Sequence, residues 1–260
     1  MKVARYRYQS RCGIGVVRGD DLVPAGEDLL KPSPVGDPVP LSAVELLSPI
    51  LPGAKIIGVG RNYAEHAEES GDITPNEPLI FAKLSNSLAA AGEAIVLPHI
   101  SDEVDFEAEL GVVIGRRASR ITPAEARSYV FGYTCVNDVS ARDLQLGDGE
   151  WTRGKSLDTF CPVGPWVVTT DEIPDPQALG IRCVLNGETM QDSSTASMLF
   201  GVDLLISFIS QGITLEAGDL ITTGTPAGVG FTRKPPRYLR RGDVVRVEID
   251  HIGALESPVV

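Results

Sequence analysis

The pattern of hydrophobic and polar residues along this chain predicts many short strands and few helices. Short apolar runs, or runs that alternate between apolar and polar residues, are typical of strands when turn residues bound them. The expected strands cover residues 55–60, 79–84, 94–97, 104–114, 132–139, 163–169, 181–185, 188–191, 220–223 and 244–249. Asn186-Gly187, between two of these strands, is typical of a type I′ hairpin turn. Such a pattern favours an α+β or mixed β architecture over a repeating βαβ sheet.

The helix signals are fewer but specific. Asn62 is a suitable N-cap for a helix that ends near Gly71. Residues 122–129 begin with Thr-Pro-Ala-Glu, which combines capping-box spacing with proline at the first helical position. Residues 202–211 carry apolar side chains at helical spacing, and Gly212 is expected to act as the C-cap.

The first fifty residues differ in composition from the rest, because they contain a proline-rich segment. Residues 31–40 (KPSPVGDPVP) hold four prolines, and proline at this density gives extended, poorly packing backbone. We therefore expect residues 1–52 to be a small N-terminal appendage with a proline-rich linker, and residues 53–260 to be the main domain. Residues 12–17 (CGIGVV) suit a short strand pair within the appendage.

The composition is that of an ordinary globular protein, with 43% hydrophobic and 22% charged residues. The 23 Lys+Arg against 35 Asp+Glu give a formal net charge of −12. Because phosphate binding requires clustered basic side chains, this balance argues against nucleic acid and anionic membrane surfaces as partners. The one basic cluster, residues 233–241, is interrupted by Pro235 and Pro236 and is typical of a solvated loop.

Targeting and membrane signals are absent from the pattern. The N-terminal sequence MKVARYRYQS lacks the apolar segment of a signal peptide. No stretch approaches the ~18 apolar residues of a membrane span. We therefore expect a soluble, cytoplasmic protein.

Several kinds of site are excluded by residue type and spacing. The four cysteines stand far apart, which argues against a disulfide framework and a zinc site, and three histidines are too few for an imidazole-rich zinc site. The EF-hand loop, the P-loop and the Gly-x-Ser-x-Gly pattern of serine esterases are not found.

The most informative segment is residues 103–110 (EVDFEAEL), in which acidic and apolar residues alternate. On a strand this alternation places Asp105, Glu107 and Glu109 on one face. Three like charges on one face repel one another. A fully solvated face tolerates that repulsion, so the segment by itself is compatible with an ordinary exposed strand.

The alternative interpretation is that a divalent cation offsets the repulsion. Glu107 and Glu109 are two residues apart, so their carboxylates project side by side from a strand and can share one ion. Hard cations such as Mg²⁺ or Mn²⁺ prefer oxygen ligands. Asp138 ends an otherwise apolar run and is the best candidate for a third carboxylate, because a charge there needs a partner. A turn hydrogen bond explains the position of Asp138 equally well.

Five ordered blocks of the sequence resemble the fumarylacetoacetate hydrolase family. They are GVGRNYAEHAEE (58–69), DFEAELGVVIG (105–115), YTCVNDVSARDLQ (133–145), RGKSLDTFCPVGPW (153–166) and ITTGTPAGVG (221–230). The similarity covers roughly residues 55–260. It is greatest to the branch that contains acylpyruvate hydrolases, oxaloacetate decarboxylases and 2-hydroxyhepta-2,4-diene-1,7-dioate isomerases. The N-terminal residues lie outside it.

The resemblance implies a mixed β-sandwich roll, usually a homodimer, with one Mg²⁺ or Mn²⁺ per site. It implies that Glu107, Glu109 and Asp138 hold the metal, which are the same three acids that the charge pattern selects.

The resemblance also implies residues that meet the substrate. Lys155 and Gln145 are expected to line the site, with Arg142 nearby and Thr225 against the substrate carboxylate. Lys155 is expected to bind that carboxylate or to stabilise developing negative charge, and a solvated turn lysine is the alternative. Lys83 interrupts an apolar strand and points either into the same pocket or outward.

His66 and Glu69 correspond to a catalytic dyad on a mobile helix in the family. Being one helical turn apart, their side chains share a face. Glu69 is expected to orient the imidazole and raise its basicity, so that His66 takes a proton from water. An ordinary charged surface helix is the alternative, since Glu65 and Glu68 lie beside them.

The function implied is hydrolysis of a C–C bond adjacent to a 2-oxo acid of the acylpyruvate type, through a metal-stabilised enolate. The alternative is an isomerase or decarboxylase on the same site, acting on 2-hydroxyhepta-2,4-diene-1,7-dioate or oxaloacetate in aromatic catabolism. A third hypothesis, from a different class, is a non-catalytic dimer whose acidic residues only solubilise a strand face.

Overall fold

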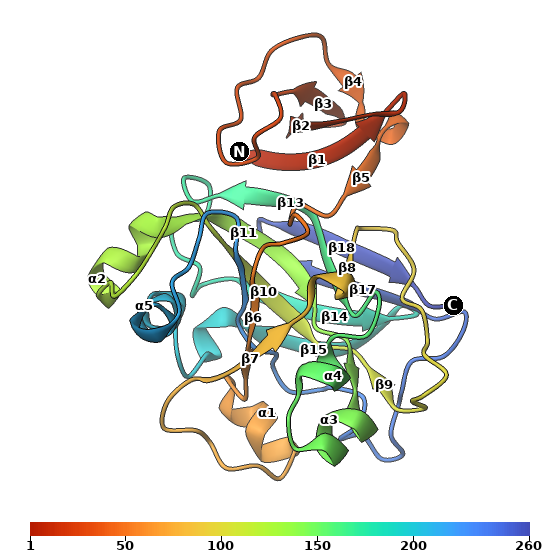
Figure 1. Cartoon of the computed structure of the whole chain (residues 1–260). Coiled ribbons are helices and arrows are strands. Elements are labelled where there is room, and N and C mark those ends of the chain that lie inside the picture. The colour runs from red at the N-terminus through yellow and green to blue at the C-terminus, as the bar shows by residue number, and fades with distance from the viewer.

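The computed structural model describes all 260 residues. The N-terminal residues form an antiparallel meander, seen in red at the top of Figure 1. Its strands are β1 (Lys2–Tyr8), β2 (Arg11–Arg18), β3 (Asp21–Pro24), β4 (Val39–Pro40) and β5 (Glu45–Leu47). The start of β1 also pairs with a strand of the main body, Val3 lying opposite Val167. The meander is therefore continuous with the main sheet.

The main sheet continues from β1 in the order β13, β11, β10, β16, β6 and β7. Its strands are β6 (Ile56–Gly60), β7 (Leu79–Lys83), β8 (Leu88–Ala89), β10 (Ala108–Ile114), β11 (Val130–Asn137), β13 (Cys161–Thr169) and β16 (Leu220–Thr222). β16 and β6 pair in parallel, as do β13 and the short β8, and the other neighbours pair antiparallel. All seven residues of β10 are buried, so this strand runs through the centre of the molecule.

A second sheet is antiparallel throughout. It consists of β15 (Glu188–Ser194), β14 (Gly180–Leu185), β17 (Val244–Ile249) and β18 (Gly253–Pro258), in that order. Along β14 and β17 every second side chain is buried, which leaves one face of the sheet apolar. That face packs on the main sheet in one core, where Leu110 and Cys135 meet Cys183 and Val247. Two sheets over a common core confirm the α+β, sandwich-type architecture with a small N-terminal region.

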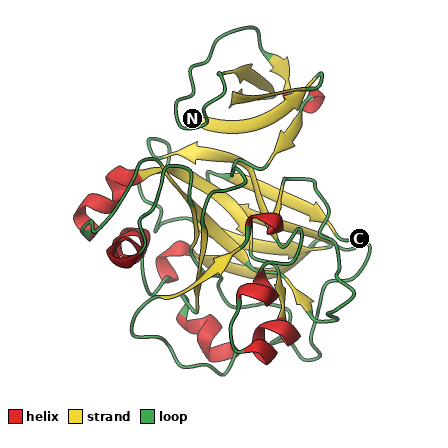
Figure 2. Cartoon of the chain, viewed as in Figure 1, coloured by secondary structure: helices red, strands yellow, loops and turns green.

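The helices are short and lie at the edges of the sheets (Figures 1 and 2). They are α1 (Ala64–Glu69), α2 (Pro123–Ala126), α3 (Arg142–Asp148), α4 (Thr152–Lys155) and α5 (Val202–Gly212), with 3₁₀ turns at Leu41–Ala43, Ser85–Ser87, Arg127–Tyr129 and Thr195–Ser197. Figure 1 shows α1, α3 and α4 together at the end of the molecule farthest from the meander. A two-stranded ribbon, β9 (Val104–Asp105) with β12 (Ser140–Ala141), lies beside them. The longest helix has 11 residues, so none can cross a bilayer.

Most expected strands and the capping box at Thr122 are confirmed. The Asn186-Gly187 turn is confirmed too, because both residues have the positive φ of a type I′ turn. Residues 94–97 are not a strand: Ile95 makes only an isolated bridge to Val259. Residues 104–114 are not one strand either, because the ladder is interrupted at residues 106–107.

Two helix ends differ from expectation. Asn62 does not cap α1, whose N-cap residue is Tyr63. The Asn62 side chain instead binds the backbone of Phe200 and Thr223, which ties β6 to distant loops. Gly212 does not terminate α5 as a left-handed cap, because it is the last helical residue and Ile213 is the C-cap.

The proline-rich residues 31–40 lie inside the N-terminal meander. They form the loop between β3 and β4 and then β4 itself, rather than a connection to the main body. Proline is tolerated in β4 because this is the outer edge of the sheet, where no further ladder hydrogen bond is needed. The chain passes to the main body over residues 48–55. The division of the chain into units 1–52 and 53–260 stays a prediction.

Candidate active site

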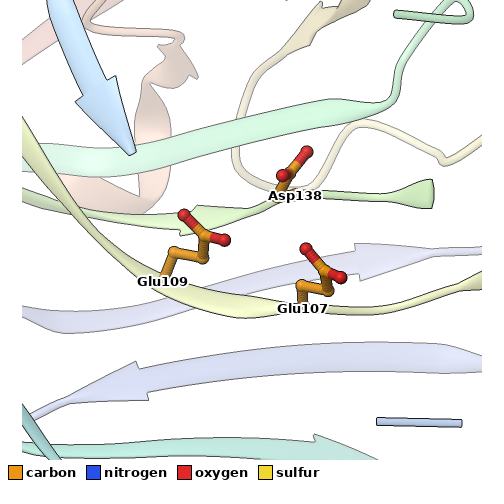
Figure 3. Close-up of side chains that lie close together, drawn as sticks. All are labelled: Glu107, Glu109 and Asp138. Atoms are coloured by element: carbon orange, nitrogen blue, oxygen red, sulfur yellow. The ribbon is translucent and has the colours of Figure 1, made fainter. Parts of the chain in front are cut away.

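Three buried carboxylates meet at the helical end of the sheets. Glu107 precedes β10, Glu109 lies within it, and Asp138 follows β11. One oxygen from each lies within 4.8 Å of those from the other two. Figure 3 shows the three carboxylates turned toward a common point. The exposed fractions of these residues are 4%, 1% and 0%, so the interpretation of a solvated strand face is wrong.

Strand register brings the third acid to the other two. β10 and β11 pair with Ala108 opposite Asn137. The next residues along, Glu107 and Asp138, are joined by a backbone hydrogen bond of 2.9 Å from the Asp138 N–H to the Glu107 carbonyl. The Asn137 side chain accepts a 3.0 Å bond from the Glu107 N–H. The backbone ladder between β10 and β11 therefore holds Glu107 and Asp138 next to each other.

The interruption at residues 106–107 separates Asp105 from the other acids. Its carboxylate accepts hydrogen bonds from the backbone N–H groups of Phe106, Gly230 and Phe231, at 2.9, 2.8 and 3.1 Å. It also pairs with Arg142 at 2.9 Å. Asp105 thus anchors the 228–231 loop and the arginine, a role that the sequence pattern did not predict.

Two lysines neutralise part of the carboxylate cluster. Lys155, at the end of α4, lies 2.6 Å from Glu107 Oε2 and 2.7 Å from Asp138 Oδ2. Lys83, at the end of β7, lies 2.5 Å from Asp138 Oδ1 and donates to the Lys155 carbonyl. Both side chains are buried. Asp138 is thus held between two ammonium groups.

Arg142 completes the basic side of the site. Its guanidinium lies 2.7 Å from Glu107 Oε1, stacks on the Phe231 ring at 4.3 Å and donates a 3.0 Å bond to Gln145 Oε1. Burial lowers the pKa of Arg142, but the charges of Glu107 and Asp105 outweigh burial and raise it. The arginine is therefore a fixed positive charge.

The pKa values of Glu107 and Glu109 are shifted in opposite directions. Burial raises the pKa of Glu107, but the charges of Lys155 and Arg142 outweigh burial and bring it to about 2. Glu109 has no cation within ion-pair distance; its one short contact is the Gly224 N–H at 2.8 Å. Burial, with the charges of Asp138 and Glu107, raises the pKa of Glu109 well above its usual value.

The donor set fits a hard divalent cation. All three carboxylates offer oxygen, which Mg²⁺, Mn²⁺ and Ca²⁺ prefer. When every group is ionised, the buried network has one more acid than base: Asp105, Glu107, Glu109 and Asp138 against Lys83, Arg142 and Lys155. The unbalanced charge lies on Glu109, beside the other two acids. A buried cluster with an unpaired carboxylate is where a cation would be stabilised.

The expected pair on α1 is formed. His66 Nδ1 lies 2.8 Å from Glu69 Oε1, and His66 is buried. Glu69 also accepts hydrogen bonds from the Gly228 N–H, at 3.0 and 3.1 Å, and from Thr232 Oγ1 at 3.1 Å. Burial raises the pKa of Glu69, but these bonds outweigh burial and lower it. The alternative of an ordinary surface helix is therefore wrong for this face of α1.

Thr225 is held by a glutamine that the sequence did not single out. The Thr225 hydroxyl donates to the Ala108 carbonyl at 2.9 Å and accepts from Gln191 Nε2 at 2.7 Å. Gln191 Oε1 in turn accepts a 2.9 Å bond from the Ala108 N–H. Gln191 is 1% exposed and lies on the second sheet, where no local pattern marks it.

These residues surround one cavity of about 40 Å³. Most predicted site residues line it; the lining comprises Val59, Gly60, Arg61, His66, Ser70, Asp72, Phe81, Glu107, Glu109, Arg142, Gln145, Leu146, Trp151, Lys155, Thr225 and Phe231. Of the predicted site residues, Asp138, Glu69 and Lys83 do not line the cavity. Lys83 was expected to meet substrate or to face outward, and its buried side chain does neither. Its contacts are to Asp138 and the Lys155 backbone. Arg61, Ser70, Asp72 and Trp151 line the cavity without having been predicted.

Comparison with known proteins reveals close relatives. Residues 55–260 match a family model described as fumarylacetoacetate (FAA) hydrolase C-terminal, and residues 1–49 match one described as Rv2993c-like, N-terminal. The chain is 48% identical to the mitochondrial oxaloacetate tautomerase fahd2 of Xenopus laevis over 221 residues, which is 84% of this chain and 69% of that protein.

Solved structures agree over the whole chain. A 2-hydroxyhepta-2,4-diene-1,7-dioate isomerase from Mycobacterium marinum is 38% identical, with a TM-score of 0.89 over 100% of this chain and 98% of that one. A fumarylacetoacetate hydrolase from Exiguobacterium antarcticum is 38% identical, with a TM-score of 0.86 over 100% and 99%. From its sequence blocks, its fold and these matches, the chain belongs to the fumarylacetoacetate hydrolase family.

Proposed function

We propose that this protein is a divalent-metal-dependent enzyme that interconverts the keto and enol forms of a 2-oxo acid, with oxaloacetate as the first substrate to test. The observation that supports it best is that Glu107, Glu109 and His66 line one small cavity, with Asp138 next to the two glutamates and Glu69 bound to the imidazole. Keto–enol exchange requires one proton to leave or join the carbon beside the carbonyl, and an imidazole held by a carboxylate suits that task. The relative from Xenopus laevis is named as such a tautomerase.

Glu107, Glu109 and Asp138 would hold the metal, for which we propose Mg²⁺ or Mn²⁺. When bound, such an ion acts as a Lewis acid toward the 2-oxo carboxylate and its carbonyl, and stabilises negative charge on the enolate oxygen. Lys83 and Lys155 position Asp138, and Lys155 and Arg142 keep Glu107 ionised.

The remaining residues bind substrate and move the proton. In the keto-to-enol direction His66 takes a proton from the carbon and the enolate oxygen takes one from water; in the reverse direction the oxygen loses its proton to water and His66 returns one to the carbon. Glu69 fixes the ring through Nδ1. Thr225 and Gln145, which line the cavity, would bind the carboxylate next to the carbonyl. Lys155 and Arg142 add positive charge where the enolate forms.

Hydrolysis of an acylpyruvate is the second candidate, and decarboxylation of oxaloacetate uses the same enolate. The specific observation in favour of hydrolysis is that the His66–Glu69 pair is equally suited to deprotonate a water molecule. The relative from Exiguobacterium antarcticum is named a hydrolase. The chemistry at the carboxylate cluster is common to all three reactions, so the fate of the enolate distinguishes them.

The test is a side-by-side assay of metal-loaded protein on enol oxaloacetate, keto oxaloacetate, acetylpyruvate and 2-hydroxyhepta-2,4-diene-1,7-dioate. We expect the loss of enol absorbance to be fastest, to stop after chelation of the metal and to return with Mg²⁺ or Mn²⁺. Pyruvate or acetate formed faster than enol is consumed would instead support decarboxylation or hydrolysis. A Glu107→Ala, Glu109→Ala variant that folds and keeps metal-dependent turnover would contradict the whole assignment.

We further propose a homodimer that acts on small molecules and not on nucleic acid. Light scattering of the purified protein tests the dimer. Binding of Mg²⁺ or Mn²⁺ that oxalate strengthens, measured by calorimetry, would argue against the non-catalytic hypothesis, because a purely structural cluster offers no place for a 2-oxo acid mimic.

A further inference from the structure

The cavity continues from the carboxylates to a more exposed end formed by other residues. Arg61, Ser70 and Asp72 line this end, together with Trp151. The Arg61 and Asp72 side chains are 31% and 36% exposed, whereas that of Glu107 is 5% exposed. A substrate bound at the Glu107 and Glu109 end of the cavity would therefore extend toward Arg61.

Arg61 differs from the other cations of the cavity. Arg142 and Lys155 are each bound to buried acids of the cluster. Arg61 contacts none of those acids, and its one ion pair is with Asp72, at 2.9 Å. It is thus the only strong base in the cavity lining whose charge is not committed to the metal-binding region.

The Arg61 side chain is held in place before any ligand arrives. Its backbone has a φ of 56°, in the left-handed region, which re-aims the chain directly after β6. Its guanidinium lies 5.5 Å from the centre of the Trp151 ring. That ring packs so closely on Gly60 that a Cβ there would lie 2.3 Å from it. An arginine with fewer conformations to lose binds an anion at lower entropic cost.

Two polar atoms at this end lack partners. Arg61 Nε and Ser70 Oγ are both buried and make no hydrogen bond. Buried donors without partners are uncommon because each costs the energy of its lost hydration. Both residues line the cavity, so an anionic group entering there would satisfy them.

We propose that Arg61 binds the far carboxylate of a 2-oxo dicarboxylic acid and so selects dicarboxylates over uncharged acyl groups. This inference rests on the proposed function, of which it defines the substrate class. Arginine suits the task because its planar guanidinium group can donate two parallel hydrogen bonds to one carboxylate. Asp72 holds the guanidinium in the free protein, and the substrate carboxylate replaces it while Ser70 donates a further bond.

The decisive experiment compares Arg61→Gln with Arg153→Gln on two substrates. Arg153 lies on α4, is exposed, pairs with Asp148 and does not line the cavity. We expect Arg61→Gln to lower kcat/KM for oxaloacetate by roughly 10- to 100-fold, through KM, because a charge-assisted bond is lost. Acetylpyruvate, which has no second carboxylate, should change less than threefold, and Arg153→Gln should change neither. Equal losses on both substrates would overturn the role of Arg61.

Oxalate binding separates this role from general damage. Oxalate reaches only the metal end, so its affinity for the Mg²⁺-loaded Arg61→Gln variant should stay within about twofold of the parent value. A large loss of oxalate affinity would show that Arg61 acts on the carboxylate cluster and would overturn the inference.

Asp72→Asn provides a test that leaves Arg61 intact. Removing the competing carboxylate should lower the KM for oxaloacetate by a few fold and leave the KM for acetylpyruvate unchanged. A KM for oxaloacetate that does not fall would contradict the idea that the substrate carboxylate replaces Asp72 on Arg61. If the unmodified protein turns over no 2-oxo acid at all, the proposed function fails and this inference fails with it. Turnover without dicarboxylate preference would overturn the inference alone.

Discussion

Glu107 and Glu109 lie two residues apart on one buried segment, yet only Glu107 has a cation within ion-pair distance. Lys155 lies 2.6 Å and Arg142 2.7 Å from Glu107, whereas the closest polar contact of Glu109 is a backbone N–H. One acid therefore belongs to a neutral network and the other carries its surplus charge. This asymmetry makes the two residues respond differently to substitution.

Glu109→Gln should leave the free energy of unfolding of the metal-free protein unchanged or raise it by up to about 2 kcal/mol, because it removes an unpaired buried acid. Glutamine keeps an oxygen for the Gly224 N–H. Glu107→Gln should lower that free energy by about 3–5 kcal/mol, because Lys155 and Arg142 lose their partner. Urea unfolding measures both, and calorimetry should find metal binding lost in each. Equal destabilisation by the two variants would contradict the asymmetry.

Metal binding should strengthen as pH rises. The pKa of Glu109 is raised in the metal-free protein by burial and by Asp138 and Glu107, so at low pH a cation must displace its proton. Affinity should therefore increase with pH until the raised pKa is passed and then level off. Calorimetry in buffers of different ionisation enthalpy should detect a proton released on binding below that pKa. Glu109→Gln removes this proton, and a parent protein that releases none would refute the prediction.

Glu69→Gln should lower kcat by roughly 10²-fold, because His66 loses the group that orients it. Glu68→Gln, on the exposed side of the same helix, is the matched control and should be neutral. The folded pKa of Glu69 is lowered, so the stabilisation it gives is present above the ordinary carboxyl pKa and is lost as pH falls through the lowered value. Hydrogen exchange of α1 amides should accelerate over that acidic range. Equal activity of the two variants would argue against the dyad.

Gly228→Ala should disrupt the loop that binds Glu69. Gly228 has a φ of 103°, and a Cβ there would lie 2.2 Å from the Met190 carbonyl oxygen. We expect a loss of about 1–3 kcal/mol in the free energy of unfolding, together with weaker activity. Gly212→Ala is the matched control, since nothing lies within 4 Å of its Cβ, and it should stabilise by about 0.4–1 kcal/mol. Thermal unfolding distinguishes the two, and equal behaviour would contradict the steric argument.

Removal of residues 1–49 should destabilise the main body. Val3 packs in a core cluster with Val163 and Val167 of β13, all of them 0% exposed. Deletion would expose this apolar surface and leave the end of β13 without its partner β1. An unpaired strand segment of this kind can pair with another chain and promote aggregation. We expect a lower unfolding temperature and more light scattering for residues 50–260. A fragment as stable as the full chain would show that the N-terminal unit is a separate domain.

The sequence was sufficient to locate most of the expected strands and, through the family resemblance, to select the acids of the site, but it left open whether those acids are buried or solvated. Hydrophobic periodicity located most strands, because a strand that faces a core on one side must alternate. Ordered sequence blocks then selected Glu107, Glu109, Asp138 and the His66–Glu69 pair, all of which the fold brings to one end of its sheets.

Only the tertiary structure decided how the charges of the site are distributed. Gln191 supports the site from a distant part of the chain, Asp105 binds the distant 228–231 loop, and Lys83 binds Asp138 instead of facing the cavity. No local pattern encodes these contacts, because they depend on strand register and on loops that meet across more than a hundred residues. Arg61 was missed for the same reason: its importance comes from the Trp151 ring and the cavity beside it, which exist only once the chain has folded.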